Sequence, residues 1–208
     1  MAEALRVIRR AGRALFEEAA TLFLLNILVT LALFIVVPFP PALAGLWSVA
    51  RRIAEGRIVH LREGWDGFVR YFWPAWGLTL VNLAVVALIA YNFWFYSPAG
   101  PFALSSSLHA ALQGVWVALL ALWGAWQMYV FPIVLEQERP HLLRAMGQAL
   151  RLLVEHPAYS LVFLVVIALL AVFSVLLQGL GFFFTPAVVA LLTVFATRHL
   201  LGRENPEP

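Results

Sequence analysis

Three long stretches of the chain carry no Asp, Glu, Lys or Arg. They cover residues 19–50, 71–135 and 156–197, which are 32, 65 and 42 residues long. A helix that crosses the hydrocarbon core of a bilayer, about 30 Å thick, needs about 20 apolar residues. The longest stretch is therefore too long for a single crossing. We predict that each of the three stretches leaves the membrane and returns, as a hairpin of two transmembrane helices.

Residues that break helices divide each stretch in two. The middle stretch predicts helices over 74–96 and 108–135, separated by a loop rich in proline, glycine and serine over 97–107. The first stretch breaks at Pro-Phe-Pro-Pro, residues 38–41, and the third breaks near Gln-Gly-Leu-Gly, residues 178–181. Proline and glycine interrupt helices because they remove a hydrogen bond or add backbone freedom.

The basic residues predict which side of the membrane each end occupies. All 14 are arginine, and they lie in four clusters that flank the charge-free stretches. Short loops rich in arginine remain in the cytoplasm. Placing all four clusters there gives six transmembrane helices, with both termini in the cytoplasm. The first stretch is short for two crossings, so a five-span protein with its N-terminus outside is the alternative. That alternative places four arginines outside the cell and the other ten in the cytoplasm.

A short amphipathic segment precedes each predicted hairpin, over residues 3–17, 61–72 and 143–155. Helices of this kind lie in the membrane plane, with arginines against anionic lipid headgroups. The sequence therefore predicts an all-α integral membrane protein with one membrane domain over residues 1–208. It would contain three units, 1–58, 59–135 and 136–208. The candidate headgroup contacts are Arg6, Arg10, Arg13, Arg51, Arg52, Arg62, Arg70, Arg144 and Arg151.

Composition narrows the chemistry further. Apolar residues make up 63% of the chain and charged residues 12%, and there is no cysteine. Disulfide and thiol chemistry are therefore excluded. A net charge of +3 confined to the edges of apolar stretches favours anionic lipid over nucleic acid as the partner. The first apolar segment, 19–37, is longer than the core of a cleaved signal peptide, so we interpret it as a retained span.

Common motifs for catalysis and for cofactor binding are absent from the sequence. It lacks the Walker A loop, the nucleophile elbow of hydrolases and the zinc-binding helix. Glu136, Glu138 and His141 are close in sequence, but residues two apart point to different faces of a helix. We therefore predict no metal site, no cofactor and no enzymatic activity. The charge-free stretches also lack the carboxylates that ion-coupled transporters carry at membrane depth.

One helix face combines indole and amide side chains. Gln113, Trp116, Trp123 and Gln127 follow helical spacing, and Asn82 lies in the preceding predicted helix. Such groups could bind a sugar-like ligand or a partner helix, and ordinary packing against neighbouring helices explains the same pattern. We treat these five residues as a candidate ligand or partner face. Patches of small residues, such as 44–45, would also suit packing against partner helices.

Three segments resemble the YesL-like family of small bacterial membrane proteins. Residues 40–58, PPALAGLWSVARRIAEGRI, form a helix that starts at proline and ends in a basic pair and a glycine. Residues 61–96 resemble the family's in-plane helix and the long span that ends in aromatic residues. Residues 128–157 resemble its proline-broken span end, acidic residue and third amphipathic helix.

The resemblance implies a location in the cytoplasmic (inner) membrane of a bacterium and an association with carbohydrate uptake. Members of the family tend to accompany ABC importers of oligosaccharides. We therefore expect a non-catalytic accessory subunit that docks onto an importer permease. Two alternatives remain open: transport of a small solute by the protein itself, and a supernumerary subunit of a respiratory or photosynthetic membrane complex.

Overall fold

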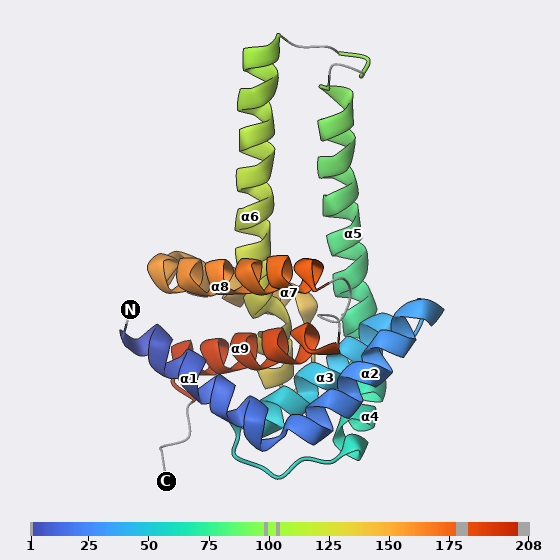
Figure 1. Cartoon of the computed structure of the whole chain (residues 1–208), viewed down its shortest axis with the longest axis vertical. Coiled ribbons are helices and arrows are strands. Elements are labelled where there is room, and N and C mark those ends of the chain that lie inside the picture. The colour runs from blue at the N-terminus through green and yellow to red at the C-terminus, as the bar shows by residue number, and fades with distance from the viewer. Residues whose placement is uncertain (1, 98–99, 103–104, 178–182, 204–208) are drawn as a thin grey trace.

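The regular structure of the protein is helical. The computed structural model describes residues 2–97, 100–102, 105–177 and 183–203. Within these ranges it contains nine helices (Figure 1). They are α1 (Ala2–Glu17), α2 (Ala19–Ile35), α3 (Phe39–Ala54), α4 (Leu61–Arg70), α5 (Phe72–Phe95), α6 (Ser106–Glu136), α7 (Leu142–Glu155), α8 (Pro157–Leu176) and α9 (Thr185–Leu200). The loop predicted at 178–181 and parts of the loop at 97–107 lie outside the described residues.

Helices α5 and α6 form an antiparallel hairpin that projects from the other helices (Figure 1). Trp123 Nε1 donates a hydrogen bond to Asn82 Oδ1 at 2.9 Å, and His109 Nδ1 lies 2.8 Å from the Tyr96 carbonyl oxygen. The two contacts are 14 residues apart on each helix, so one register holds along the hairpin. The predicted helices 74–96 and 108–135 are confirmed to within two residues at each end.

The remaining helices form a body at the base of this hairpin, with α3 at its centre. Helix α3 packs against α2, α4, α5, α6 and α9, and its Leu46, Val49 and Ala50 are completely buried. Figure 1 shows α8 and α9 running across the direction of the hairpin rather than alongside it.

Three helices are long and apolar enough to cross a membrane, namely α5, α6 and α8. The count rises to four if α1 and α2, which are bent by 87° at their junction, serve as one broken span. The other apolar helices are short: α2 has 17 residues, and α3 and α9 have 16 each. At 1.5 Å per residue they reach only about 25 Å. The structure therefore shows a multi-pass helical membrane protein, but it does not show the six spans predicted from the sequence.

The three predicted amphipathic segments are helices, α1, α4 and α7. Small residues make up most of the buried positions on α1 and α4, while α7 also buries Leu152 and Leu153. Larger apolar side chains, including Leu5, Trp65 and Leu143, stay exposed. Small residues allow close helix packing, and the exposed large ones suit insertion into the interfacial region of a bilayer. The buried small residues are Ala4, Val7, Ala11 and Ala14 on α1, Gly64 and Gly67 on α4, and Ala145 and Ala149 on α7.

Helices α3 and α4 cross in close contact. A Cβ atom on Gly45 would lie 2.5 Å from the Gly64 carbonyl oxygen, and one on Gly67 would lie 2.5 Å from the Ser48 Cβ. Only glycine fits at these contacts. The small residues at 44–45, which the sequence suggested for partner helices, therefore pack within the chain.

Candidate functional site

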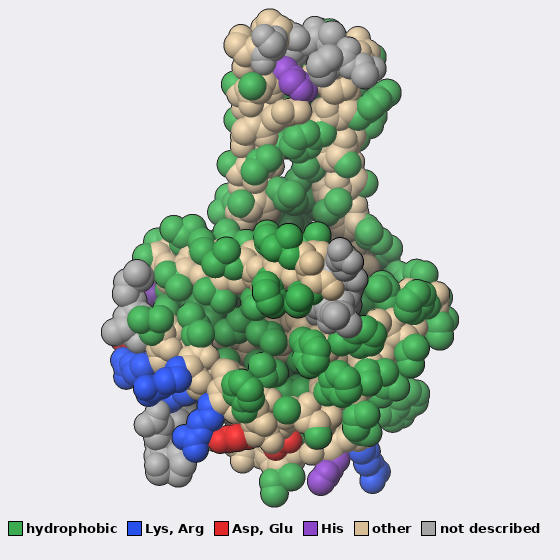
Figure 2. Space-filling view, in the orientation of Figure 1, with side chains coloured by type: hydrophobic (Ala, Val, Ile, Leu, Met, Phe, Trp, Pro, Cys, Tyr) green, Lys and Arg blue, Asp and Glu red, His purple; other side chains and the backbone are tan. Residues whose placement is uncertain are grey.

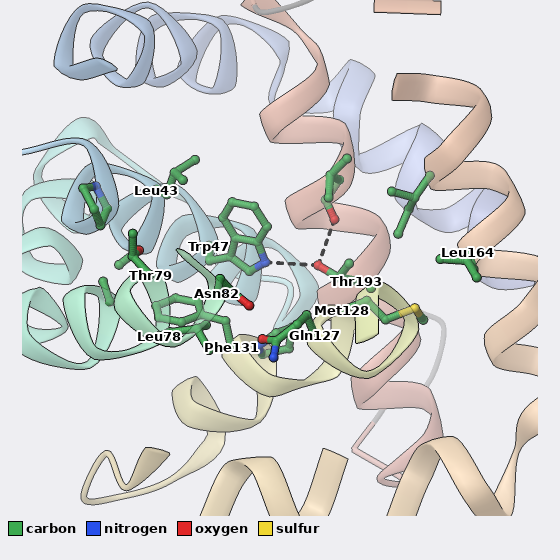
Figure 3. Close-up of a pocket in the computed structure, with 17 residues that line it drawn as sticks. Leu43, Trp47, Leu78, Thr79, Asn82, Gln127, Met128, Phe131, Leu164 and Thr193 are labelled. Carbon is green, nitrogen blue, oxygen red and sulfur yellow. Dashed lines mark hydrogen bonds between the residues drawn. The ribbon is translucent and has the colours of Figure 1, made fainter. Parts of the chain in front are cut away.

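A pocket of about 360 Å³ lies where α3, α5, α6, α8 and α9 meet (Figure 3). We call it the central pocket. Most of its surface is aliphatic or aromatic, and two of its residues, Asn82 and Gln127, belong to the face predicted from the sequence. The complete lining is Pro40, Leu43, Ala44, Trp47, Ala75, Leu78, Thr79, Asn82, Gly124, Gln127, Met128, Phe131, Pro132, Leu164, Ile167, Val189 and Thr193.

One wall of the pocket is fixed by a hydrogen bond between α3 and α9. Trp47 Nε1 donates to Thr193 Oγ1 at 3.1 Å, and the same hydroxyl donates to the Val189 carbonyl oxygen at 2.8 Å (Figure 3). Both polar groups are therefore satisfied. Neither Trp47 nor Thr193 was predicted from the sequence; a tryptophan in the middle of an apolar helix was the available signal.

Gln127 differs from the other polar groups in the wall. Its Oε1 and Nε2 atoms are both buried, and neither makes a hydrogen bond within the described part of the chain. A buried polar group without a partner costs about 1–3 kcal/mol. Asn82, by contrast, uses its Oδ1 to accept the Trp123 bond. Pro132 has no backbone N–H. The carbonyl oxygen of Met128, four residues earlier on α6, therefore receives no helical hydrogen bond from it.

The central pocket can bind through hydrogen bonds but supplies no acid–base chemistry. None of its 17 lining residues is ionisable. The Thr79 and Thr193 hydroxyls have no base beside them among these residues, and nucleophilic catalysis requires such a base. The pocket is therefore suited to a neutral molecule.

The five residues of the candidate face lie in different surroundings in the structure. Trp116 and Trp123 line a second, almost wholly apolar hollow of about 820 Å³ between α5, α6, α7 and α8, which we call the lateral groove. The Trp116 Nε1 atom makes no hydrogen bond within the described chain. Gln113, one turn from Trp116, lines neither the central pocket nor the lateral groove. The five residues thus do not form one binding face.

A cluster of ion pairs lies at the end of α6 and joins it to α3 and α9. Glu136 Oε1 is 2.6 Å from Arg198 Nη1, and Glu136 Oε2 is 2.7 Å from Arg203 Nη1. Arg51 Nε lies 3.3 Å from Glu136 and 3.0 Å from Glu55. A carboxylate held by three guanidinium groups is a poor ligand for a metal cation. Sequence reasoning missed this cluster because it paired Glu136 with its chain neighbours.

The arginines predicted to contact lipid headgroups fall into two groups. Some are engaged within the chain: Arg51 in the cluster, Arg52 with Glu63 at 3.8 Å, and Arg70 with the Glu138 carbonyl oxygen at 3.2 Å. The others that stay exposed are Arg6, Arg13, Arg62, Arg144 and Arg151, of which Arg13 also pairs with Glu17 at 2.7 Å; Arg10 is half-buried. Exposed arginines can reach a membrane surface, so headgroup contact stays a prediction for this second group.

Comparison with known proteins gives one match. Residues 20–93, from the start of α2 to near the end of α5, match the family described as Protein of unknown function, DUF624. No curated protein and no solved structure matches the chain. Members of the matched family are commonly described as YesL-like membrane proteins, the family that the sequence segments resemble. The match covers 74 of the 208 residues, so this part of the chain is similar to the DUF624 family.

Proposed function

We propose that the protein is a non-catalytic subunit of a membrane complex and that it docks onto the transmembrane helices of a partner through the α5–α6 hairpin. The partner proposed is the permease of a carbohydrate ABC importer. The observation that carries the docking is the exposure of the hairpin. The identity of the partner rests on the resemblance to the YesL-like family.

The hairpin helices leave most of their apolar surface uncovered by the rest of the chain. Only 6% of the most apolar part of α5 is buried. Figure 2 shows apolar side chains over most of the projecting hairpin. The large exposed side chains include Leu80, Leu83, Val86 and Leu88 on α5 and Val115, Val117, Leu119 and Leu122 on α6.

A polar group on α6 favours a protein partner over lipid chains alone. The amide of Gln113 is half-buried and makes no hydrogen bond with another described residue. Acyl chains cannot supply one, whereas polar side chains of a neighbouring helix can. Beside it, a Cβ atom on Gly114 would meet nothing within 4 Å, and Ala118 one turn further is exposed. Small residues at this spacing allow another helix to approach closely.

The orientation that we propose places the arginine-rich end in the cytoplasm. Exposed Trp73 and Trp94 lie 21 residues apart on α5, which is about 32 Å of helix and matches a hydrocarbon core. On the face shown in Figure 2, charged side chains gather at the end away from the hairpin tip. Six spans with both termini inside remain part of the proposal. They require α8 and α9 to turn relative to Figure 1, and they require the bilayer to thin around the short helices α2, α3 and α9.

Site-specific photocrosslinking tests the docking directly. A photoreactive residue at Val117 on α6 should form an adduct in native membranes, and mass spectrometry should identify the attached protein as an importer permease. The matched control is Val172 on α8, a valine of equal exposure (57%) on a different helix. Adducts at both positions with unrelated proteins, or none at Val117, would reject docking through the hairpin. A specific adduct with a different membrane complex would keep the docking and reject the importer.

A further inference from the structure

We propose that the central pocket is a binding site for a small neutral molecule with an apolar body and a carbonyl oxygen, such as a ketone, a quinone or an ester. The carbonyl oxygen accepts hydrogen bonds from the side chains of Thr79 and Asn82 on α5. The proposal is independent of the hairpin docking, because the residues named for docking, such as Gln113 and Val117, do not line this pocket.

Two hydrogen-bond donors in the lining have no acceptor. The Asn82 Oδ1 atom accepts a hydrogen bond from Trp123 Nε1 at 2.9 Å. An indole N–H can only donate, so the oxygen of the Asn82 amide must face Trp123, and Nδ2 keeps both of its N–H groups for another partner. Neither Asn82 Nδ2 nor the Thr79 hydroxyl makes a hydrogen bond within the described residues. The Thr193 hydroxyl, by contrast, both donates and accepts.

Both unpaired donors are open to a bound molecule. Thr79 and Asn82 are half-buried, and neither unpaired atom is sealed by neighbouring side chains. The amide atoms of Gln127 are sealed in this way, so Gln127 is not part of the proposed site. Residues three apart on a helix are neighbours on one face, with about 5–6 Å between their Cβ atoms, and both residues project from α5 (Figure 3). A carbonyl oxygen has two lone pairs, so it can accept from both side chains.

The rest of the lining determines the body of the molecule. None of the 17 residues is ionisable, so a bound ion would pay a large desolvation penalty without a counter-charge. The apolar lining, which includes Leu78, Phe131 and Ile167, suits an aliphatic or aromatic body. A cavity of about 150 Å³ accommodates benzene, so a pocket of about 360 Å³ would hold about two such rings. A sugar fits poorly, because its hydroxyl donors would outnumber the acceptors in the wall.

Three compounds of similar shape test this inference. Benzophenone joins two phenyl rings through a ketone; diphenylmethane has the same rings and no polar group; diphenylamine joins them through an N–H donor. Binding of each radiolabelled compound to the full chain in lipid nanodiscs is measured by equilibrium dialysis, with empty nanodiscs as the control for partition into lipid. Benzophenone should bind saturably and about tenfold or more tightly than the other two. Equal binding of the three compounds, or no saturable binding of benzophenone, overturns the proposal.

Irradiation of the bound ketone locates the site. Light-excited benzophenone forms a covalent bond at nearby C–H groups, and mass spectrometry then identifies the labelled residue. We expect labelling of residues that line the central pocket, such as Leu78 and Met128, and excess unlabelled benzophenone should reduce it. Labelling confined to other parts of the chain, or labelling that the excess does not reduce, would contradict the central pocket as the site.

Variants of the two donors test the contacts themselves. Thr79→Val keeps the shape and removes the hydroxyl, so benzophenone should bind severalfold more weakly while diphenylmethane binds as before. Thr30→Val makes the same change on α2, outside the pocket, and should have no effect. Asn82→Leu should also weaken binding, but it breaks the bond to Trp123. Trp123→Phe breaks the same bond and keeps both donors, so binding should persist. Unchanged binding in Thr79→Val and Asn82→Leu, or an equal loss in Trp123→Phe, would contradict the proposed contacts.

Discussion

Arg198 on α9 and Glu136 on α6 form a short, almost buried ion pair, with 2.6 Å between Nη1 and Oε1 and side-chain exposures of 10% and 7%. The pair joins the end of the longest helix to the C-terminal helix. Arg51 and Arg203 contact the same carboxylate, so one acidic side chain holds three elements of the chain together. Removing one partner from a buried pair leaves an uncompensated charge.

Glu136→Gln should therefore be strongly destabilising. The substitution removes one of the two carboxylates that Arg198 and Arg51 share, and leaves Glu55 at 3.4 Å from Arg198 and 3.0 Å from Arg51. Breaking a buried pair costs about 3–5 kcal/mol, so we expect a loss near the lower end of this range. Thermal unfolding of the purified protein in detergent measures the loss. The control is Glu17→Gln, which breaks an exposed pair with Arg13 and should change stability by less than about 1 kcal/mol. Similar small effects of both substitutions would show that the cluster contributes little.

The crossing of α3 and α4 gives a second prediction. Gly45→Ala should destabilise the protein by about 1–3 kcal/mol, because the new methyl group meets the Gly64 backbone at 2.5 Å and the two helices must separate. Gly147→Ala is the matched control: it lies within α7 with nothing within 4 Å of the added Cβ. Alanine is the better helix former, so this variant should be neutral or slightly more stable. A neutral Gly45→Ala would contradict the close crossing.

The first turn of α4 predicts a dependence on pH. Burial tends to raise the pKa of Glu63, but hydrogen bonds from the backbone N–H groups of Glu63 and His60, together with the charge of Arg52, lower it below its usual value of 4.5. The His60 N–H donates to Glu63 Oε2 at 2.7 Å. Because the pKa is lower in the folded state, the stabilisation is complete above pH 4.5 and is lost as the pH falls through the lowered value.

Hydrogen exchange of the α4 amides measures this effect. Protection factors, corrected for the intrinsic exchange rate, should fall severalfold between pH 6 and pH 3 in the wild type. Glu63→Gln cannot titrate, so its α4 protection should be insensitive to pH over this range. Equal pH dependence in both proteins would assign the change to other groups.

The hairpin and the helical class could be predicted from the sequence because both depend on local signals. A charge-free stretch of 65 residues with a proline- and glycine-rich centre specifies α5 and α6 to within two residues. The number of spans could not be predicted in the same way, because apolar composition does not fix helix length. One break precedes α2 and another separates α2 from α3, and both helices are left short of a full crossing.

The site was predictable only in part, for a related reason. Helical spacing correctly placed Gln127 and Trp123 on α6, and Asn82 on α5 does meet Trp123. Spacing along one helix cannot show where neighbouring helices cover it, so it could not separate Gln113 and Trp116 from the central pocket. Trp47, Thr193 and the Glu136–Arg198 pair depend on contacts between residues 62 or more positions apart, which no local pattern specifies.

Labelling of single cysteines in intact cells tests the central claim most directly, namely that the α5–α6 hairpin crosses the bilayer with the arginine-rich end inside. The chain has no native cysteine. Ser105, exposed at the hairpin tip, and Ile58, 81% exposed between α3 and α4, are suitable positions. A membrane-impermeant maleimide should label Ser105→Cys in sealed cells, and should label Ile58→Cys only after the membrane is opened. Labelling of both positions in sealed cells, or of Ile58→Cys alone, would contradict the claim.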